Sequence, residues 1–444
     1  MKEQLNQQDE LSRRGFISNA AKTFLGVGLL PAVHQSNALG AGAGASVHKQ
    51  VPTAKNVIYL YMDGGMSHLD TLDPKPGDEC MGSTKTIKSN VDGIQLGENL
   101  PRLAKHMDKT AIVRSMTSTQ GAHKQGNYFM HTSYALRGTI RHPAMGAWLL
   151  TFQDKHNATL PGNVMIGNGS KHPGAGFFES RLQPLMINNP EGGLENAKRA
   201  SFLTEGKFDK NLDLARKLDA PFANKYDVKN VRAYTDMYDD AVTMMRSRDL
   251  AAFDLEKEPE YLREQYGKNP FGQGCLLARR LVENNVRFVE VTLGSWDTHN
   301  SNFTRVPEKA EVLDQALSTL LRDLDRRGLL NETLVVLCSE FGRTPEINQN
   351  EGRDHHPQAF STLLAGGGIV GGQVFGATDK QGSKVTENKV TVPDFNATIA
   401  YALGIPLDHV LYSPTKRPFT VADKGQPILN LFGSGPSNYN HAGA

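Results

Sequence analysis

Acidic and imidazole side chains follow three apolar segments of the chain, each near the point where the segment ends. Asp63 follows the run NVIYLYM, Glu340 comes shortly after the run LVVL, and Asp297 with His299 follows the run VRFVEVTL. Short β-branched and aromatic runs of this kind predict buried strands. In open α/β sheets, ligands bind outside the carboxyl ends of the strands. The three segments therefore predict a ligand site along one edge of a sheet.

The residue types at this edge suit a metal ion. Asp297 and His299 are separated by one residue, and side chains at that spacing on an extended segment point the same way. Mixed imidazole and carboxylate ligands favour zinc, manganese or iron, whereas an all-oxygen set favours calcium or magnesium. We expect a divalent metal ion, with zinc, manganese and calcium as the candidates.

The loop after Glu340 is rich in charged groups. Gly342 and Pro345 exclude regular structure there, and the loop carries Arg343, Arg353, Asp354, His355 and His356. Arg343 and Arg353 are candidate substrate-binding residues, because a guanidinium group can bind an anion in a bidentate manner. The alternative is that both arginines pair with acids of the loop, such as Asp354.

A hydroxyl-rich turn, TSTQGAHKQGN, leads into a helix that is predicted to begin near Asn127. The free N–H groups of a helix N-terminus can bind an anion, which makes Asn127 a candidate substrate-binding residue. Thr117, Ser118 and Thr119 are candidate nucleophiles, although capping of the helix by these hydroxyls explains them equally well. His123 is a candidate general acid, since imidazole titrates near neutral pH; its alternative role is to cap or pack the turn.

Composition sets the broad class of protein. The chain has 444 residues, of which 39% are hydrophobic and 22% charged, as in ordinary globular proteins. The 49 Lys and Arg residues nearly balance the 47 Asp and Glu residues, so the charge gives no reason to expect nucleic acid as a partner. The three cysteines form no C-x-x-C pair, and Cys338 is predicted to be a small core residue.

Residues 1–46 are predicted to be a twin-arginine (Tat) signal peptide and linker. The motif SRRGFI precedes a weakly apolar stretch and a tail of small residues, which resembles a Tat export signal. The apolar stretch is shorter than the roughly 20 residues that a membrane span needs, so no permanent span is expected. We expect the Tat translocase to be a partner and the mature protein, residues 47–444, to be periplasmic or extracellular.

The elements that must position these residues alternate between strands and helices. This order predicts an α/β fold with a largely parallel central sheet sandwiched by helices. A charged, helix-rich stretch at about 192–268 is predicted to be a helical insertion packed over or beside that sheet. The predicted strands are 56–62, 110–116, 163–166, 286–293, 334–337 and 360–364, and the main predicted helices are 271–284, 307–326 and 391–403.

Four motifs support a family resemblance. The segments LYMDGGMSHLDTLDPKP, WDTHN, SEFGRTP and GRDHHP resemble the exported bacterial family called domain of unknown function 1501, over about residues 55–432. That family resembles the alkaline phosphatase and sulfatase superfamily. The resemblance implies an alkaline phosphatase-like sheet between helices, one or two divalent metals, and hydrolysis of phosphate or sulfate esters through a Ser, Thr or modified Cys nucleophile.

The resemblance also implies a set of metal ligands. Asp297, His299 and His355 match the residues of one metal site, Asp63 matches the acid after the first strand, and Glu340 falls where the superfamily has the Asp of a second site. The superfamily follows that Asp with His, whereas this chain has Phe in the next position.

Two functions follow from these observations. The first is an exported metal-dependent hydrolase of phosphate or sulfate esters, with a small-molecule or glycan ester as substrate. The second is a non-catalytic envelope protein that keeps the fold and binds a glycan or a partner.

Overall fold

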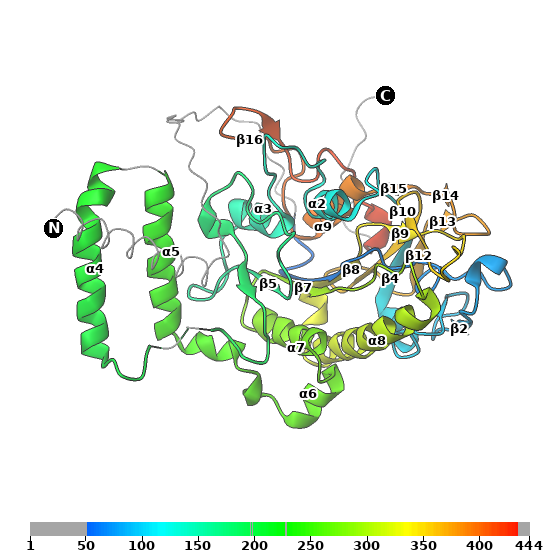
Figure 1. Cartoon of the computed structure of the whole chain (residues 1–444), viewed down its shortest axis with the longest axis horizontal. Helices are drawn as coiled ribbons and strands as arrows, with labels where there is room; N and C mark the ends of the chain where they lie inside the picture. Colours follow the sequence, from blue (N-terminus) through cyan, green and yellow to red (C-terminus); the bar gives the residue numbers. More distant parts are fainter. Residues whose placement is uncertain (1–50, 196, 198, 227–228, 434–444) are drawn as a thin grey trace.

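The computed structural model describes residues 51–195, 197, 199–226 and 229–433, so the predicted signal peptide lies outside the described residues. A nine-stranded sheet forms the centre of the molecule, in the order β12-β4-β11-β8-β1-β7-β5-β6 with β15 beside β4 (Figure 1). Its strands are β1 (Asn56–Met62), β4 (Thr110–Thr117), β5 (Asn163–Ile166), β6 (Leu185–Ile187), β7 (Phe288–Leu293), β8 (Thr333–Cys338), β11 (Phe360–Ala365), β12 (Gln373–Phe375) and β15 (Val390–Thr391).

The sheet is largely parallel. β11 runs antiparallel to both of its neighbours, β4 and β8, whereas β6, β5, β7, β1 and β8 all run in one direction. The predicted α/β fold with a largely parallel sheet between helices is therefore confirmed, with β11 as the reversed strand.

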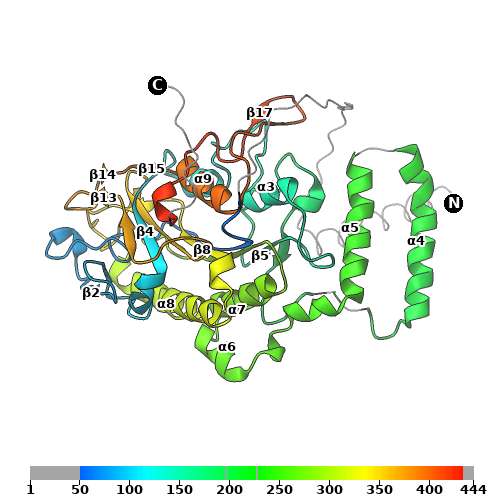
Figure 2. The ribbon, with the colours of Figure 1, turned by 180° about the vertical axis from the view of Figure 1, so that it is seen from behind.

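The central strand β1 shows why both faces of the sheet are covered. Val57, Tyr59 and Tyr61 belong to one buried core, and the alternate residues belong to the other. A strand buried on both faces reads as a continuous apolar run. Helices α2 (His123–Thr132), α3 (Met145–Phe152) and α9 (Val392–Ala402) cover the first face, and α7 (Pro270–Glu283) and α8 (Asn302–Arg326) cover the second (Figures 1 and 2).

Helix α2 begins at His123, after Ala122 as N-cap, so the predicted start near Asn127 is wrong. Gly126 made this segment resemble a loop. In the structure a Cβ at Gly126 would lie 3.1 Å from Cβ of Glu340, so glycine lets the first turns of α2 lie against the end of β8. Helix α8 likewise begins one turn ahead of the predicted Pro307, at Asn302.

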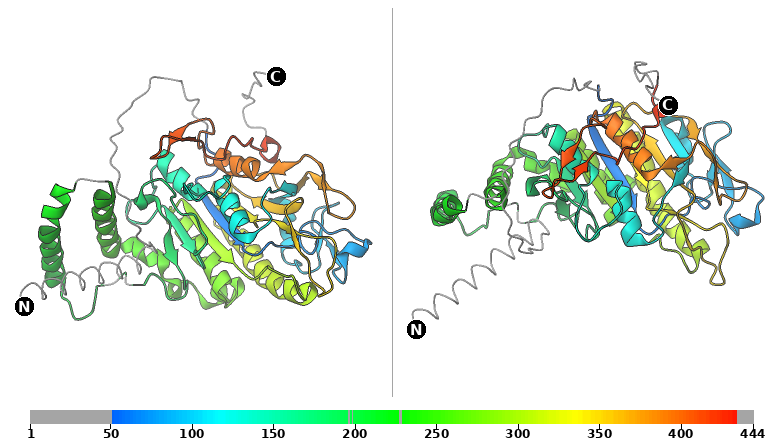
Figure 3. Two further views of the ribbon diagram at one scale, coloured as in Figure 1. Left: turned by 45° about the horizontal axis from the view of Figure 1, so that its top comes forward. Right: turned by 90° about the horizontal axis from the view of Figure 1, so that it is seen from above.

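The predicted insertion contains a pair of helices, α4 (Glu205–Lys225) and α5 (Lys229–Arg246), which extend beside the sheet (Figure 3). An ion pair of 2.8 Å between Arg216 and Asp239 joins them. After α5, the hydroxyl of Ser247 accepts a hydrogen bond from the N–H of Asp249 and caps a 3-10 helix. Helix α6 (Glu260–Tyr266) contacts α7 and α8.

Four two-stranded sheets lie outside the central one: β2 (Thr86–Lys88) with β3 (Gln95–Gly97), β9 (Gly342–Arg343) with β10 (His355–His356), β13 (Ala377–Thr378) with β14 (Val385–Glu387), and β16 (Leu411–Tyr412) with β17 (Pro418–Phe419). The 3-10 helices are Glu79–Met81, Leu103–Lys109, Ser180–Leu182, Arg248–Phe253, Leu255–Lys257, Leu330–Glu332 and Leu429–Leu431. None of the helices in the described part of the chain is both long and apolar enough to cross a bilayer.

Candidate metal centre

The carboxyl ends of β1, β7 and β8 lie side by side because these strands are adjacent and parallel. Asp63, Asp297 and Glu340 follow those ends, and the backbone N–H of Trp296 donates to the carbonyl of Asp63 at 3.3 Å. The structure thus brings together the three strand ends that Asp63, Asp297 and Glu340 follow in the sequence.

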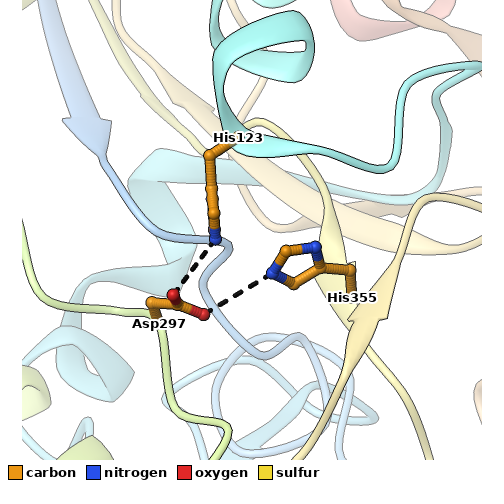
Figure 4. Close-up of side chains that lie close together, drawn as sticks. All are labelled: His123, Asp297 and His355. Carbon is orange, nitrogen blue, oxygen red and sulfur yellow. Dashed lines mark ion pairs between the residues drawn. The ribbon is translucent and has the colours of Figure 1, made fainter.

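Three imidazole rings converge on the carboxylate of Asp297, and Figure 4 shows two of them, His123 and His355. The Nε2 atom of His123 lies 3.3 Å from Oδ2, and the Nε2 atoms of His299 and His355 lie 3.3 Å and 3.6 Å from Oδ1. His123 comes from the first turn of α2, whereas His355 lies on β10. Four groups from three segments of the chain therefore lie close together at the edge of the sheet.

The Nδ1 atom of each ring is held by an acceptor. A carboxylate or carbonyl oxygen at this position requires Nδ1 to carry the hydrogen, which leaves Nε2 as a lone pair in the neutral ring. Such partners orient histidines that bind metals and raise their basicity. The pairs are His123 with Glu340 at 2.7 Å, His299 with Asp354 at 2.7 Å, and His355 with the carbonyl of Gly121 at 2.8 Å.

In the neutral rings, these tautomers leave Nε2 lone pairs that would suit a bound cation. The Nε2 atoms of His299 and His355 are 3.0 Å apart, where two lone pairs repel each other. The Nε2 atom of His123 is buried without a hydrogen-bond partner among the described residues. Donor atoms of His123, Asp297 and His355 lie within 4.8 Å of one another, as ligands of one metal ion would. The residues present therefore fit a divalent metal.

Burial and neighbouring charges shift the pKa values of the residues at the centre. Burial alone would raise the pKa of Asp297, but the hydrogen bond and charge of Arg343 lower it to about 2. Burial lowers the pKa of His355, aided by the charge of Arg343. For His123, burial lowers the pKa, but Glu340 and Asp297 outweigh that effect and the net shift is upward. The carboxylate of Asp297 is therefore ionised at every pH at which the protein would work.

Glu340 lies behind this centre, although it was predicted as a metal ligand. Its buried carboxylate accepts hydrogen bonds from His123, from the hydroxyls of Tyr61 and Ser339 at 3.0 and 3.1 Å, and from the N–H of Gly64 at 3.0 Å. These contacts allow Glu340 to orient the ring of His123, and its role as a metal ligand stays a prediction.

Asp63, the other predicted carboxylate ligand, pairs with a lysine. The Nζ atom of Lys171, from the loop after β5, lies 3.2 Å from its Oδ2. The ammonium group of Lys171 thus places a positive charge beside Asp63, the position for which a metal ion is predicted. Asp63 stands beside the three imidazoles without joining them.

The two predicted anion-binding arginines are buried and hydrogen bonded within the protein. Arg343 donates to Asp297 at 2.6 Å and to the carbonyls of Gly65 and Arg353. Arg353 donates to Asp70 at 3.0 Å and to backbone carbonyls of its own loop. Neither guanidinium group is exposed, so the prediction that they bind a substrate anion is corrected: they hold the loop and Asp297 in place.

Of the predicted nucleophiles, Thr117 is the last residue of β4, and Ser118 and Thr119 lie in the turn before α2. Thr117 donates to the carbonyl of Val390 at 3.2 Å and Ser118 to that of Gln120 at 3.4 Å, while Thr119 accepts from the Gln120 amide at 3.0 Å. No contact among the described residues joins these hydroxyls to Asp297. Asn127, predicted as substrate-binding, lies in the second turn of α2, and its side chain is buried.

A second buried cluster could not be anticipated from sequence motifs. Glu290, on β7, lies 3.1 Å from Nε2 of His131 and 3.4 Å from Nε2 of His172. The N–H of Gly174 donates to Nδ1 of His172, so Nε2 of His172 carries the hydrogen and points it at Glu290. Nδ1–H of His131 donates to the carbonyl of Asn127, so a second hydrogen on Nε2, facing Glu290, requires the imidazolium form, which the raised pKa of His131 favours. Hydrogen bonds from the two histidines to Glu290 satisfy this cluster without a metal ion, and we infer that it contributes to the stability of the fold.

Solved structures offer a comparison at low identity. A lipoteichoic acid synthase, LtaP, from Listeria monocytogenes is 10% identical, with 85% of this chain and 76% of that chain covered and a TM-score of 0.42. The PsFucS1 sulfatase from Pseudoalteromonas sp. is 13% identical, with coverage of 84% and 73% and a TM-score of 0.38. A variant of the alkaline phosphatase PafA is 11% identical, with coverage of 86% and 100% and a TM-score of 0.42.

Sequence families give a definite assignment. A search of curated proteins finds no match. Residues 54–432 match the family described as protein of unknown function (DUF1501), which confirms the resemblance carried by the four motifs at the strand ends. The match spans most of the chain and includes every residue of the candidate metal centre, so the protein belongs to the DUF1501 family.

Proposed function

We propose that the protein is a metal-dependent hydrolase of phosphate or sulfate esters, with one divalent ion held by His123, Asp297, His299 and His355. The observation that carries the proposal is the convergence of three Nε2 atoms on one carboxylate, each ring being fixed through Nδ1. A set of three imidazoles and one carboxylate favours zinc, manganese or iron over calcium. When bound, such an ion supplies Lewis acidity that polarises an ester oxygen.

The surrounding residues prepare this centre. Arg343 keeps Asp297 ionised through a 2.6 Å hydrogen bond. Glu340 and Asp354 hold the rings of His123 and His299 by charge-assisted hydrogen bonds, which are roughly twice as strong as neutral ones. Little reorganisation is then needed when the ligands bind, which is how preorganised sites gain affinity.

Lys171 is the cation that we assign to the ester's charged group. Its side chain is 46% exposed, in contrast to the buried guanidinium groups of Arg343 and Arg353. Its partner Asp63 follows β1, next to the segment that bears Asp297. An ammonium group placed there can turn from Asp63 to a phosphate or sulfate oxygen.

Thr117, Ser118 and Thr119 stay the candidate nucleophiles. Their turn reaches the centre at Gly121, whose carbonyl holds the ring of His355. Ser118 is partly buried and Thr119 is exposed, so both hydroxyls can be reached from solvent. His123 changes role from general acid to ligand, since its Nδ1 bonds Glu340 and its Nε2 faces Asp297.

The alternative function is binding without catalysis. One observation favours it: the hydroxyls of the turn bond within that turn or to β15, and none contacts Asp297 among the described residues. In that case the same metal centre would bind a glycan or partner without turnover.

Elemental analysis of the purified protein, followed by a screen of phosphate and sulfate esters with the metal found, tests the proposal. We expect about one ion per chain and turnover of at least one ester class. A protein that binds no divalent ion contradicts both functions. A metal-loaded protein that leaves all phosphate and sulfate esters untouched contradicts the hydrolase and supports the binding protein.

A further inference from the structure

A cavity of about 560 Å³ lies between the loop that follows α2 and the hairpin of β16 and β17. Helix α2 and the β16–β17 hairpin, which contribute to its lining, lie on the face of the sheet covered by α2, α3 and α9 (Figures 1 and 2). Phe129 of α2 lines the cavity, whereas His123 in the first turn of α2 belongs to the metal centre. At 1.5 Å per helical residue, His123 and Phe129 are roughly 9 Å apart along α2.

One wall of the cavity is aromatic. The rings of Tyr134 and His142 stack with centroids 4.4 Å apart, and Phe419 packs edge-on against both, at 5.2 and 4.9 Å. The hydroxyl of Tyr134 donates to the carbonyl of Thr420 at 2.8 Å and accepts from its N–H at 3.1 Å. These bonds fix the wall to the hairpin, so the apolar surface exists without a ligand.

His142 contributes a defined hydrogen-bond donor. The hydroxyl of Tyr128 accepts from the backbone N–H of His142 at 2.5 Å, and its single hydrogen is then donated to Nδ1 at 2.8 Å. Nδ1 is therefore an acceptor, and Nε2 carries the hydrogen of the neutral ring. Burial and the charge of Arg137 lower the pKa of His142 to about 4, so the ring stays neutral. His142 is 2% exposed and is part of the cavity lining.

The mouth of the cavity is cationic. Arg137, Arg417 and Lys424 line it together with one acid, Asp423. Within the described part of the chain, none of these three cations forms an ion pair, although most other arginines do. Asp423 and Lys424 have positive φ values of 45° and 65°, a strained conformation that persists where the surrounding structure enforces it. The cavity thus offers donors and positive charge around an apolar wall.

We propose that this cavity binds a sugar ring that bears a sulfate or phosphate group. The ring would lie against Tyr134 and Phe419, with its anionic group between Arg137 and Arg417 and a hydroxyl on Nε2–H of His142. Cavities of roughly 300–1,000 Å³ with an apolar lining and a few placed polar groups are typical of small-ligand sites. The further assignment of the cavity as a subsite for a second unit of an anionic saccharide substrate rests on the proposed function. The binding of the sugar itself does not depend on that function.

A titration of the full-length protein tests the inference without any need for turnover. The probes are a sulfated disaccharide, its unsulfated parent and inorganic sulfate, each followed by calorimetry. We expect the sulfated disaccharide to bind more tightly than the other two. The double variant Arg137→Ala with Arg417→Ala should weaken its binding by about tenfold or more, since two charge-assisted contacts are lost.

Arg326→Ala serves as the matched control, because Arg326 is exposed at the end of α8, away from the cavity. Its affinity should stay within about twofold of wild type, since distant sites act independently. The inference is overturned if the disaccharide does not bind, if the double variant binds as wild type does, or if the unsulfated parent or sulfate alone binds equally well. Failure of ester hydrolysis with intact binding would instead contradict the proposed function alone.

Discussion

His299 and His355 face each other through their Nε2 atoms at 3.0 Å, while the Nδ1 atom of each ring is held by an oxygen acceptor. Two neutral rings in these tautomers would repel. The contact therefore supports the proposed cation site more directly than any single residue of the motif does, and it is the basis of the first prediction.

His299→Ala and His355→Ala should each abolish binding of the divalent ion, because each removes one of four ligands. His356→Ala is the control: it is adjacent in sequence, but its Nε2 bonds the carbonyl of Ser383 at 2.7 Å. Elemental analysis gives the metal content of each variant. Metal retained in both ligand variants would contradict the assignment of the centre.

Removing the metal with a chelator should lower the stability of the wild type. An ion present at 100 times its dissociation constant stabilises the folded state by about 2.7 kcal/mol. Urea unfolding with and without chelator measures this difference, and His299→Ala should show none. An identical shift in that variant would mean that the chelator acts elsewhere.

Glu340→Gln should weaken metal binding by roughly 10–100-fold, as loss of groups that orient metal-binding histidines does. The amide keeps the size of the side chain but removes the charge that holds Nδ1–H of His123. Competition with a chelator of known affinity measures the change. An unchanged affinity would show that the Glu340 charge does not act on the centre.

Lys171→Met should raise the KM for the best ester by about tenfold and leave the metal content intact, since one charge-assisted contact amounts to roughly 1.4 kcal/mol. Lys389→Met, at an exposed site before β15, is the control. Steady-state kinetics separate KM from kcat. A fall in kcat with constant KM would assign Lys171 to the chemical step and contradict a role in binding.

The buried pair of Glu290 and His131 should give a pH-dependent contribution to stability. Burial raises the pKa of Glu290, but His131 and His172 outweigh it and lower the pKa overall. Burial lowers the pKa of His131, but Glu290 outweighs it and raises it. The contribution from Glu290 is thus complete above its unfolded value of 4.5 and lost in stronger acid, and that from His131 is complete below 6.5 and lost as pH rises through its raised pKa.

Stability from this pair should therefore be greatest between about pH 4.5 and 6.5. Glu290→Gln should reduce the free energy of unfolding in that range by about 3–5 kcal/mol, the usual result of breaking a buried pair. Urea unfolding at pH 5.5 and pH 9 compares the variant with wild type. An equal loss at every pH would mean that packing, and not charge, accounts for the effect.

Much of the fold follows from local sequence patterns. β1 and β5 have the predicted bounds, because apolar β-branched runs between turn residues are short-range signals. The start of α2 was missed, since Gly126 looks like a helix breaker until Glu340 is seen packed against it. Such close approaches arise between segments far apart in the chain.

The candidate site likewise contains residues that local sequence patterns identify and residues that only the folded chain brings together. The motifs identified Asp297, His299 and His355, because each stands at or near a strand end. The ligand position of His123 depends on its contact with Glu340, 217 positions away, and no spacing rule connects them. A His at the start of a helix that follows a strand of the same sheet was the available signal. Burial of Arg343 is likewise a property of the folded chain.

The reversed direction of β11 has a mechanical consequence for the centre. Residues 339–359 leave the sheet on β8 and re-enter it on the adjacent β11, where Leu337 pairs with Leu363. Within this segment β9 and β10 pair as well, with Arg343 opposite His355. Strand pairing therefore holds this segment at both ends and in its middle. His355 can move away from the centre only if sheet hydrogen bonds break. We therefore expect this part of the centre to be rigid and its backbone amides to exchange hydrogen as slowly as those of the central sheet.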